Sequence, residues 1–257
     1  MQTLNDLRLA VLIDAENIPH INIRGMLEEI AKYGTPTFKR IYGDWTKPSV
    51  SGWKAVLLEN AITPVQQYSY TRGKNSTDSA MIIDAMDILY SGKIDGFCIV
   101  SSDSDFTRLA TRLREAGMKV FGIGEKKTPS AFIVACDKFI YLEILNSVSA
   151  QPESSAVPGR KGANAGRRKP REDPDQQSAI GRVKRLIAGS ISDLADDNGW
   201  AFLGDVGNLI LKKQPDFDPR SYGFSKLTPL IRSLDFEIDE RESGRDHIKH
   251  IFIRNRK

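Results

Sequence analysis

Several carboxylates lie next to apolar segments in the first half of the chain. Carboxylates gathered at one edge of a sheet repel one another and raise their pKa values unless a cation compensates the charge. An all-oxygen ligand set suits Mg²⁺ or Mn²⁺, which keep positions open for water and phosphate oxygens. The pattern therefore predicts a divalent metal site suited to phosphodiester hydrolysis. The acids in question are Asp14, Asp44, Asp78, Asp103 and Asp105.

Each of these acids also has a structural interpretation. An Asp directly before a helix often caps it, which is worth about 1 kcal/mol, and for Asp103 or Asp105 alone capping is an equally good explanation. Capping does not explain why three expected strands and one expected helix place acids at one edge, so we favour metal binding for the set. Asp84 lies six helical positions after Asp78 and points about 120° away from it. It stays open between a buried structural acid and a ligand.

Polar and basic residues near the acids are candidates for binding substrate. Asn17 either caps the helix expected beyond Pro19, orients a carboxylate or binds the scissile phosphate. Lys74 and Arg72 either grip the substrate backbone or pair with the acids, and a solvated loop charge is an equally good explanation. Ser102, directly after an expected strand, completes the candidate substrate-binding set.

Apolar patterns indicate the elements that position these residues. Continuous apolar runs are typical of strands buried on both faces of a parallel sheet, and apolar residues at helical spacing separate them. Strand and helix therefore alternate, which predicts an α/β fold built from right-handed βαβ units. In such sheets ligands bind beyond the carboxyl ends of the strands, where the acids lie. The expected strands are residues 9–13, 38–45, 62–68, 96–101 and 119–123, and the expected helices are residues 49–59, 77–90, 105–116 and 130–142.

A change of composition divides the chain into domains. Residues 149–177 are rich in Pro, Gly, Ser, Ala, Arg and Lys, which predicts a flexible basic linker between domains at 1–148 and 178–257. In the second domain three helical patterns precede two strand-like segments, the order of a winged helix, which often binds nucleic acid. The helices are expected at 180–197, 203–212 and 225–234, and the strands at 236–239 and 247–254, joined by a turn at 243–245.

The basic residues of this second domain are candidates for contacting RNA phosphates. Because their surplus over the acidic residues is small, a solvated surface is a serious competing explanation. The candidates are Lys184, Arg185, Lys212, Lys213, Lys226 and Arg232.

Composition limits the remaining possibilities. The net charge of +4 on 257 residues is too small to identify a partner by itself. Two cysteines are typical of buried thiols in a reducing compartment, and three histidines cannot form a zinc cluster. No apolar run approaches the roughly 20 residues needed to span a bilayer, and no signal-peptide core precedes Asp14. We therefore expect a soluble cytoplasmic protein.

A series of short motifs follows in order at residues 11–17, 74–78, 83–87, 99–106 and 124–129. Each is weak alone, but the set is specific, spans nearly all of residues 8–145 and resembles the NYN domain family, a LabA-like branch of the PIN-like nucleases. The resemblance implies an α/β/α Rossmann-like nuclease fold. Many relatives have Gly at the position of Ser102, and Ser still allows the turn. The implied catalytic and metal-binding acids are Asp14, Asp78, Asp103 and Asp105, with Asp44 as a further metal ligand.

The C-terminal sequence has a resemblance of its own. Residues 204–211, 217–227 and the terminal strand resemble the OST-HTH or LOTUS module. This resemblance implies binding of RNA, which in some relatives is G-rich or quadruplex RNA, and in other relatives binding of a protein partner.

Two classes of function remain. The leading hypothesis is a Mg²⁺- or Mn²⁺-dependent endoribonuclease, with single-stranded or structured RNA delivered to the acids by the second domain. The alternative is a non-catalytic RNA-binding regulator that uses its acids structurally. Asp78 argues against a Toprim-like site, and the lack of Asp-x-Asp after the first strand argues against a haloacid-dehalogenase type of phosphatase. No Gly-x-Gly-x-x-Gly follows that strand, so we expect no nicotinamide cofactor; a homodimer is left open.

Overall fold

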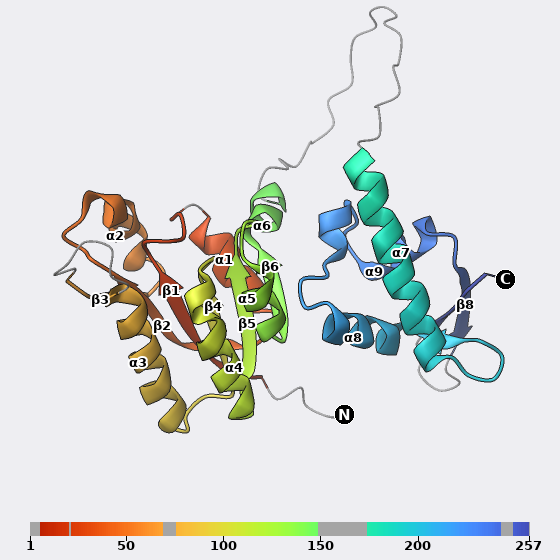
Figure 1. Cartoon of the computed structure of the whole chain (residues 1–257), viewed down its shortest axis with the longest axis horizontal. Helices are drawn as coiled ribbons and strands as arrows, with labels where there is room; N and C mark the ends of the chain where they lie inside the picture. Colours follow the sequence, from red (N-terminus) through yellow and green to blue (C-terminus); the bar gives the residue numbers. More distant parts are fainter. Residues whose placement is uncertain (1–5, 21, 69–75, 149–173, 243–248, 257) are drawn as a thin grey trace, which may run out of the picture. The chain divides into compact units, whose positions relative to one another are not determined.

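The computed structural model describes residues 6–20, 22–68, 76–148, 174–242 and 249–256. They form two compact units, the first largely within residues 1–150 and the second largely within residues 151–257 (Figure 1). Within the described ranges, every helix is too short or too polar to cross a lipid bilayer.

A six-stranded parallel sheet forms the centre of the first unit. The order across the sheet is β3-β2-β1-β4-β5-β6. The five strands predicted from the sequence are confirmed, with ends that differ by a few residues. In chain order the strands are β1 Arg8–Asp14, β2 Thr35–Gly43, β3 Thr63–Gln66, β4 Gly96–Val100, β5 Lys119–Gly124 and β6 Lys138–Tyr141.

The direction of strand addition reverses at β1. The chain runs outward from β1 through β2 to β3, and then crosses to the other side of β1 to form β4. Ile13 of β1 therefore pairs with both Ile41 of β2 and Val100 of β4. Doubly wound sheets bind ligands at such a switch point. The expectation that Asp14 and the acids after β4 share one edge of the sheet is confirmed.

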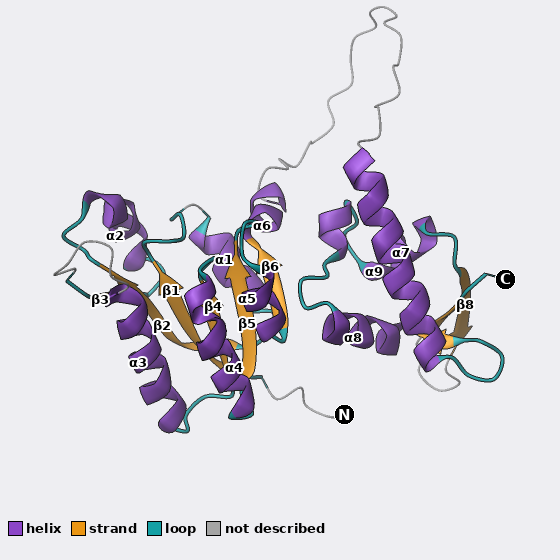
Figure 2. Ribbon diagram, viewed as in Figure 1, coloured by secondary structure: helices purple, strands orange, loops and turns teal. Residues whose placement is uncertain are grey.

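Helices cover both faces of the sheet (Figure 2). Successive side chains of β1 point to opposite faces, so that Val11 and Ile13 join one apolar core while Ala10 and Leu12 join the other. The first core is covered by α1 (Ile23–Ile30), η1 (Pro48–Trp53), α2 (Lys54–Leu57) and α6 (Leu142–Val148). The second core is covered by α3 (Ser76–Tyr90), η2 (Ser104–Phe106), α4 (Thr107–Glu115) and α5 (Ser130–Ala135).

The helix predicted at residues 130–142 is wrong. It divides into α5, strand β6 and the start of α6. The reason is a clasp at Asp137, whose backbone N–H donates to the carbonyl of Val120 at 2.8 Å while its carboxylate accepts from the Val120 N–H at 2.9 Å. The chain leaves the helix at Cys136 in an extended conformation and joins the sheet beside β5. A four-residue apolar strand is too short for its periodicity to be distinguished from helix.

The second unit combines helices with a small antiparallel sheet of order β7-β9-β8. The predicted order of three helices and two strands is confirmed, and the two-residue strand β7 was not predicted. Helix α7 begins inside the segment expected as a linker, and the expected turn at 243–245 lies outside the described residues. The elements are α7 Pro174–Leu194, β7 Ala201–Phe202, α8 Leu203–Lys213, η3 Pro219–Tyr222, α9 Leu227–Ser233, β8 Glu237–Glu242 and β9 Lys249–Arg254.

Candidate metal centre

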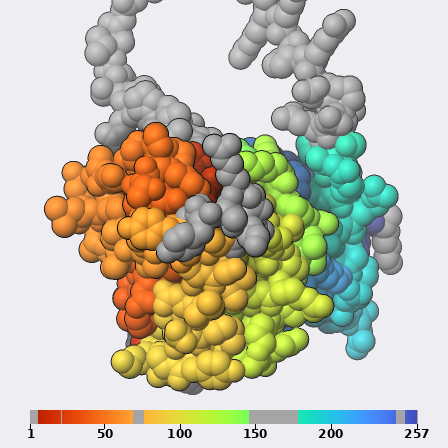
Figure 3. All heavy atoms as spheres, turned by 60° about the vertical axis from the view of Figure 1, so that its left-hand side comes forward, coloured from red at the N-terminus to blue at the C-terminus, as the bar shows by residue number. Residues whose placement is uncertain are grey.

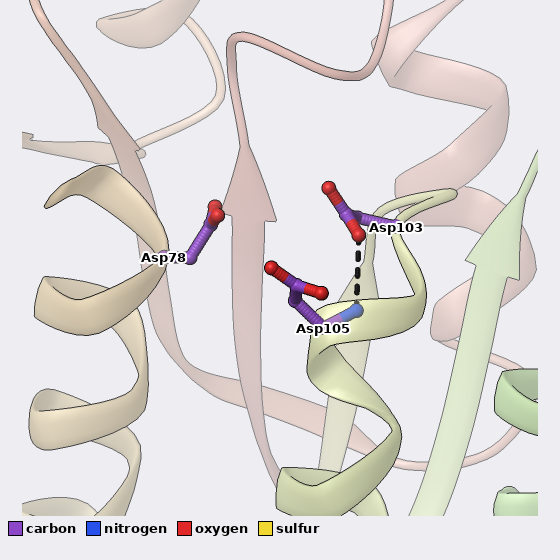
Figure 4. A group of neighbouring side chains, drawn as sticks. All are labelled: Asp78, Asp103 and Asp105. Carbon is purple, nitrogen blue, oxygen red and sulfur yellow. Dashed lines mark hydrogen bonds between the residues drawn. The ribbon is translucent and has the colours of Figure 1, made fainter. Parts of the chain in front are cut away.

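Three carboxylates converge at the switch point of the sheet. Asp78, Asp103 and Asp105 each offer one oxygen, and these oxygens all lie within 4.8 Å of one another. Figure 4 shows Asp78 on α3 facing Asp103 and Asp105, which come from the turn after β4 and from η2. In the space-filling view of Figure 3, α3 and α4 lie side by side on one face of the first unit. Folding therefore brings Asp78 to two acids that lie 25 and 27 positions later in the sequence, beyond β4.

Asp78 lies in the first turn of α3, where the helix dipole favours a carboxylate. Burial raises the pKa of Asp78 to about 6, and the negative charges of Asp14, Asp103 and Asp105 add to the effect. Among the described residues, no lysine or arginine forms an ion pair with Asp78. Clustered oxygen donors with an excess of negative charge fit a hard divalent cation.

Asp103 and Asp105 begin the helical turn η2. Asp103 caps it, since its Oδ1 accepts a hydrogen bond from the backbone N–H of Asp105 at 2.9 Å. The capping interpretation is therefore confirmed for Asp103. This hydrogen bond uses one lone pair of the Asp103 carboxylate. It orients the carboxylate and leaves other lone pairs to bind a metal ion.

Asp14 ends β1 and is only 3% exposed. Its Oδ1 accepts from the backbone N–H groups of Glu16 and Asn17, at 3.1 and 3.2 Å, and its Oδ2 accepts from the Ser101 hydroxyl at 3.0 Å. Burial raises the pKa of Asp14 to about 6, although these hydrogen bonds lower it. Asp14 is outside the three-oxygen group, but its charge acts on Asp78. It is a firmly oriented acid at the edge of the cluster.

Ser101 is a residue of the candidate site that the sequence reasoning missed. This fully buried serine donates to Asp14 Oδ2, and its Oγ accepts the backbone N–H of Asp103 at 3.1 Å. One hydroxyl thus fixes the acid at the end of β1 relative to the turn after β4. The available signal was a polar residue at the end of an apolar strand.

Glu16 is a second residue that was left without a role. Its Oε2 accepts from the Thr77 hydroxyl at 3.1 Å, and its Oε1 pairs with Lys47 Nζ at 2.7 Å. Its charge contributes to the raised pKa values of both Asp14 and Asp78. The visible signal was the pair of acids, two positions apart, directly after a strand.

The structure does not bring Asp44 into the three-oxygen group. Its buried Oδ1 accepts from the Thr46 backbone N–H and hydroxyl, at 3.2 and 2.6 Å, and from Gln66 Nε2 at 3.0 Å. These bonds fasten the turn after β2 to the end of β3. They explain Asp44 without a metal, and its place in the metal site stays a prediction.

Asn17 does not cap the helix that follows it, because Asn22 does so by accepting the Gly25 N–H at 3.1 Å. The capping alternative for Asn17 is therefore wrong. Its Oδ1 accepts instead from the backbone N–H of Ser102 at 3.3 Å, and Ser102 Oγ accepts the N–H of Glu125 at 2.8 Å. The two side chains hold together the loops after β1, β4 and β5. Their substrate contacts stay predictions.

Of the remaining candidate residues in the first unit, the structure describes only one. Lys74 and Arg72 lie outside the described residues. Asp84 is described, and its carboxylate pairs with Arg40 and accepts from the Tyr42 hydroxyl, both on β2. The structural interpretation of Asp84 is thus the one that its contacts support.

The basic candidates of the second unit differ in their surroundings. Lys213 pairs with Asp193 at 2.5 Å, and Arg232 pairs with Glu240 at 2.6 Å. An RNA phosphate that binds Lys213 or Arg232 would have to compete with the carboxylate already paired with that residue. The other four are exposed, and their contacts with RNA stay predictions: Lys184, Arg185, Lys212 and Lys226.

Comparison with protein families gives this geometry a context. Residues 8–143, more than half of the chain, match the family model of the NYN domain. This chain belongs to the NYN domain family. Residues 175–248 match the OST-HTH/LOTUS domain, so both resemblances expected from the sequence are confirmed. The NYN domain belongs to a superfamily of nucleases, and in this NYN protein the acidic cluster lies at the switch point of the NYN sheet.

Two solved structures are similar to parts of this NYN protein. A crystal structure of a protein of unknown function from Vibrio parahaemolyticus is 20% identical and covers 55% of this chain and 96% of its own, with a TM-score of 0.46. A solution NMR structure of an uncharacterized protein from Nitrosomonas europaea is 29% identical and covers 42% of this chain and 93% of its own, with a TM-score of 0.27. No curated protein matches the chain.

Proposed function

We propose that this NYN protein is a metal-dependent ribonuclease that cleaves RNA internally at the acids of the switch point. The observation that carries the proposal is the convergence of the Asp78, Asp103 and Asp105 oxygens within 4.8 Å. Membership of a nuclease superfamily supports it. The raised pKa of Asp78 adds a physical reason, because the cluster is costly to ionise without a cation.

The donor set supports Mg²⁺ or Mn²⁺ as the cofactor, held by Asp78, Asp103 and Asp105. When bound, such an ion activates water and neutralises charge on phosphate oxygens. The chain's own residues supply the positioning: Ser101 keeps Asp14 and the turn at Asp103 in register. The proposed substrate contacts are Asn17, Arg72, Lys74 and Ser102.

We further propose that the OST-HTH/LOTUS domain binds single-stranded or structured RNA and delivers it to the NYN domain. A tethered binding domain raises the local substrate concentration without adding contacts at the catalytic site. The proposed domains are residues 1–148 and 178–257, joined by the basic linker 149–177, in a cytoplasmic protein.

Cleavage of labelled RNA by the purified full chain tests the ribonuclease. We expect Asp103→Asn to lower the rate at least about a hundredfold, because a metal-centred site loses most of its transition-state stabilisation with one ligand. Binding of the same RNA in EDTA should be unchanged. The matched control is Asp87→Asn, an exposed acid on the helix that carries Asp78. Equal cleavage by wild type and Asp103→Asn would refute the proposal.

A non-catalytic RNA-binding regulator is the second candidate. The observation in its favour is that Asp14 and Asp103 have structural work of their own, as a hydrogen-bond hub and as a helix cap. The two candidates differ in metal-dependent turnover. Wild-type protein that binds RNA but leaves a panel of RNAs intact at millimolar Mn²⁺ would favour the regulator.

A further inference from the structure

The small sheet of the second unit has one face toward the core and one face toward solvent. Side chains alternate along β9. Ile253 is fully buried on the inner face, and Ile251 lies two residues before it. His250, Phe252 and Arg254 therefore occupy the outer face, where two of the three residues carry rings.

Rings from the first strand of the sheet continue this outer face. Phe202 of β7 is the cross-strand partner of Phe252, with ring centroids 5.8 Å apart, and its ring lies 5.6 Å from that of His250. Ala201 is buried, so Phe202 and Trp200 on either side of it belong to the outer face. Phe202 is 36% exposed. Outer positions of a half-buried sheet are normally polar, so burial in this domain does not explain these rings.

Two guanidinium groups lie on the rings. The Arg241 guanidinium carbon is 4.1 Å from the centroid of Phe252, and that of Arg254 is 4.6 Å from Trp200. Both guanidinium groups also form ion pairs, Arg241 with Asp239 at 2.8 Å and Arg254 with Glu237. Arginines fixed in this way offer flat surfaces with little loss of side-chain entropy on binding. We define the stacking face as Trp200, Phe202, Arg241, His250, Phe252 and Arg254.

Two glycines leave room for this arrangement. A Cβ on Gly204 would lie 2.7 Å from the Phe202 ring, closer than van der Waals contact allows. Gly199 has a φ of +82°, a left-handed conformation that favours glycine, and a Cβ there would approach the Arg254 side chain to 3.2 Å. The backbone beside the sheet therefore accommodates the ring and the arginine where they lie.

We propose that the stacking face binds unpaired bases of single-stranded RNA. The inference rests on the proposed RNA-binding role of this domain and names the surface and the form of RNA. Aromatic rings and guanidinium planes on a sheet are the groups that take splayed bases by stacking. Bases inside a duplex are already stacked on one another, so the face selects unpaired segments.

The charges of the face favour bases over phosphates and over an apolar protein partner. Arg241 and Arg254 are balanced by Asp239 and Glu237, so the surface offers planar groups with little net positive charge. The outer residues of the described sheet include no aliphatic side chain for an apolar partner to cover. Stacking consequently dominates, and the affinity should depend less on salt than phosphate-driven binding does.

Fluorescence anisotropy of the full chain with a labelled RNA lacking self-complementarity tests the proposal, in EDTA so that no cleavage occurs. Phe202→Leu and Phe252→Leu keep apolar volume but remove a ring, and each should weaken binding about tenfold, the usual cost of losing one stacked base. Duplex RNA should bind weakly to all variants. Arg182→Gln on α7 is the control, since it removes an exposed charge that is not among the candidate phosphate contacts and leaves the sheet intact. Lys184→Gln, at a candidate phosphate contact of the same helix, tests the competing helix surface.

A second pair of variants guards against misfolding. Arg241 is exposed, and Arg241→Lys keeps the positive charge but removes the planar guanidinium group. If this variant melts at the wild-type temperature and binds RNA more weakly, the result supports stacking. Trp200→Phe should keep the affinity and lose most of the fluorescence quenching by RNA.

Wild-type affinity in both phenylalanine variants would overturn the proposal and leave a protein partner as the occupant of the face. Loss of binding in Lys184→Gln alone would assign RNA to the helices instead. These binding experiments do not depend on cleavage, because they are done in EDTA. The proposed nuclease activity is tested separately, by the cleavage rate of Asp103→Asn with metal present.

Discussion

Asp78 is a carboxylate whose surroundings oppose its own ionisation. Burial is the main cause of its raised pKa of about 6, and four neighbouring acids contribute. A group whose folded pKa lies above the unfolded value of about 3.9 favours folding most at low pH, and this contribution is lost as the pH rises through 6. We therefore expect the ionised Asp78 to destabilise the metal-free NYN domain at neutral pH.

Asp78→Asn should consequently raise the melting temperature of the metal-free protein at pH 8. A rise of the pKa from about 3.9 to about 6 corresponds to about 3 kcal/mol. Solvent screening at the half-exposed position of Asp78 reduces this to about 1 kcal/mol, or a few degrees. At pH 4 the gain should disappear, because Asp78 is then largely protonated. Thermal unfolding in EDTA measures both values.

Asp87→Asn, on the exposed side of the same helix, is the control for this effect and should leave the melting temperature unchanged. A lower melting temperature for Asp78→Asn at pH 8 would show that the carboxylate stabilises the site without a cation. The electrostatic argument would then fail.

Helix α3 determines where Asp78 lies, and a polar network fastens that helix to the sheet. Asp84, six residues beyond Asp78, binds Arg40 and the Tyr42 hydroxyl of β2. The pKa of Tyr42 is raised by its burial and by this hydrogen bond, so the hydroxyl stays protonated and remains a donor. The network fixes both the position and the rotation of α3.

Asp84→Ala should therefore cost about 1–3 kcal/mol of unfolding free energy, because it leaves the buried Tyr42 hydroxyl and the partly buried Arg40 without their acceptor. It should also weaken Mn²⁺ binding, although Asp84 contacts no candidate ligand. Tyr42→Phe should have a smaller effect, since the Arg40 pair remains. Denaturant unfolding and Mn²⁺ titration check the two parts, and undiminished metal affinity in a destabilised Asp84→Ala would show that α3 does not position the site.

The elements also show what the sequence could and could not predict. The buried run before Asp14 predicted β1 because a strand covered on both faces is apolar at every position. Strand β6 was missed because its four residues depend on the non-local clasp between Asp137 and Val120. Strand β7 has two residues and forms only through its pairing with β9.

The candidate site divides in the same way. Placement of acids at strand ends predicted the cluster, because topology carries those ends to one edge. The hub at Ser101 depends on the register of β1 and β4, which a single sequence does not reveal. Asn22 displaced Asn17 as a helix cap because α1 begins later than the Pro19 signal suggested.

At the scale of the whole molecule, the chain joins a nuclease-family domain to a second domain of the OST-HTH/LOTUS family. If the second domain delivers RNA, its contribution belongs to substrate capture and not to the chemical step. Damage to the stacking face should then separate KM from kcat.

A Phe202→Leu, Phe252→Leu double variant should raise KM for long single-stranded RNA about tenfold or more and leave kcat unchanged. Cleavage of an oligonucleotide too short to reach both domains should be unaffected. Steady-state kinetics on matched long and short RNAs provide the measurement. An equal loss on both substrates would show that the domain acts on catalysis or folding instead of delivery.

The acids that we propose to hold a divalent ion are Asp78 at the start of α3 and Asp103 and Asp105 after β4. Electron paramagnetic resonance of Mn²⁺ titrated into the full chain counts bound ions directly. The account predicts Mn²⁺ binding that Asp78→Asn and Asp103→Asn weaken at least about tenfold and that Asp87→Asn leaves intact. Binding of equal strength in wild type and both ligand variants, or no binding at millimolar Mn²⁺, would contradict it.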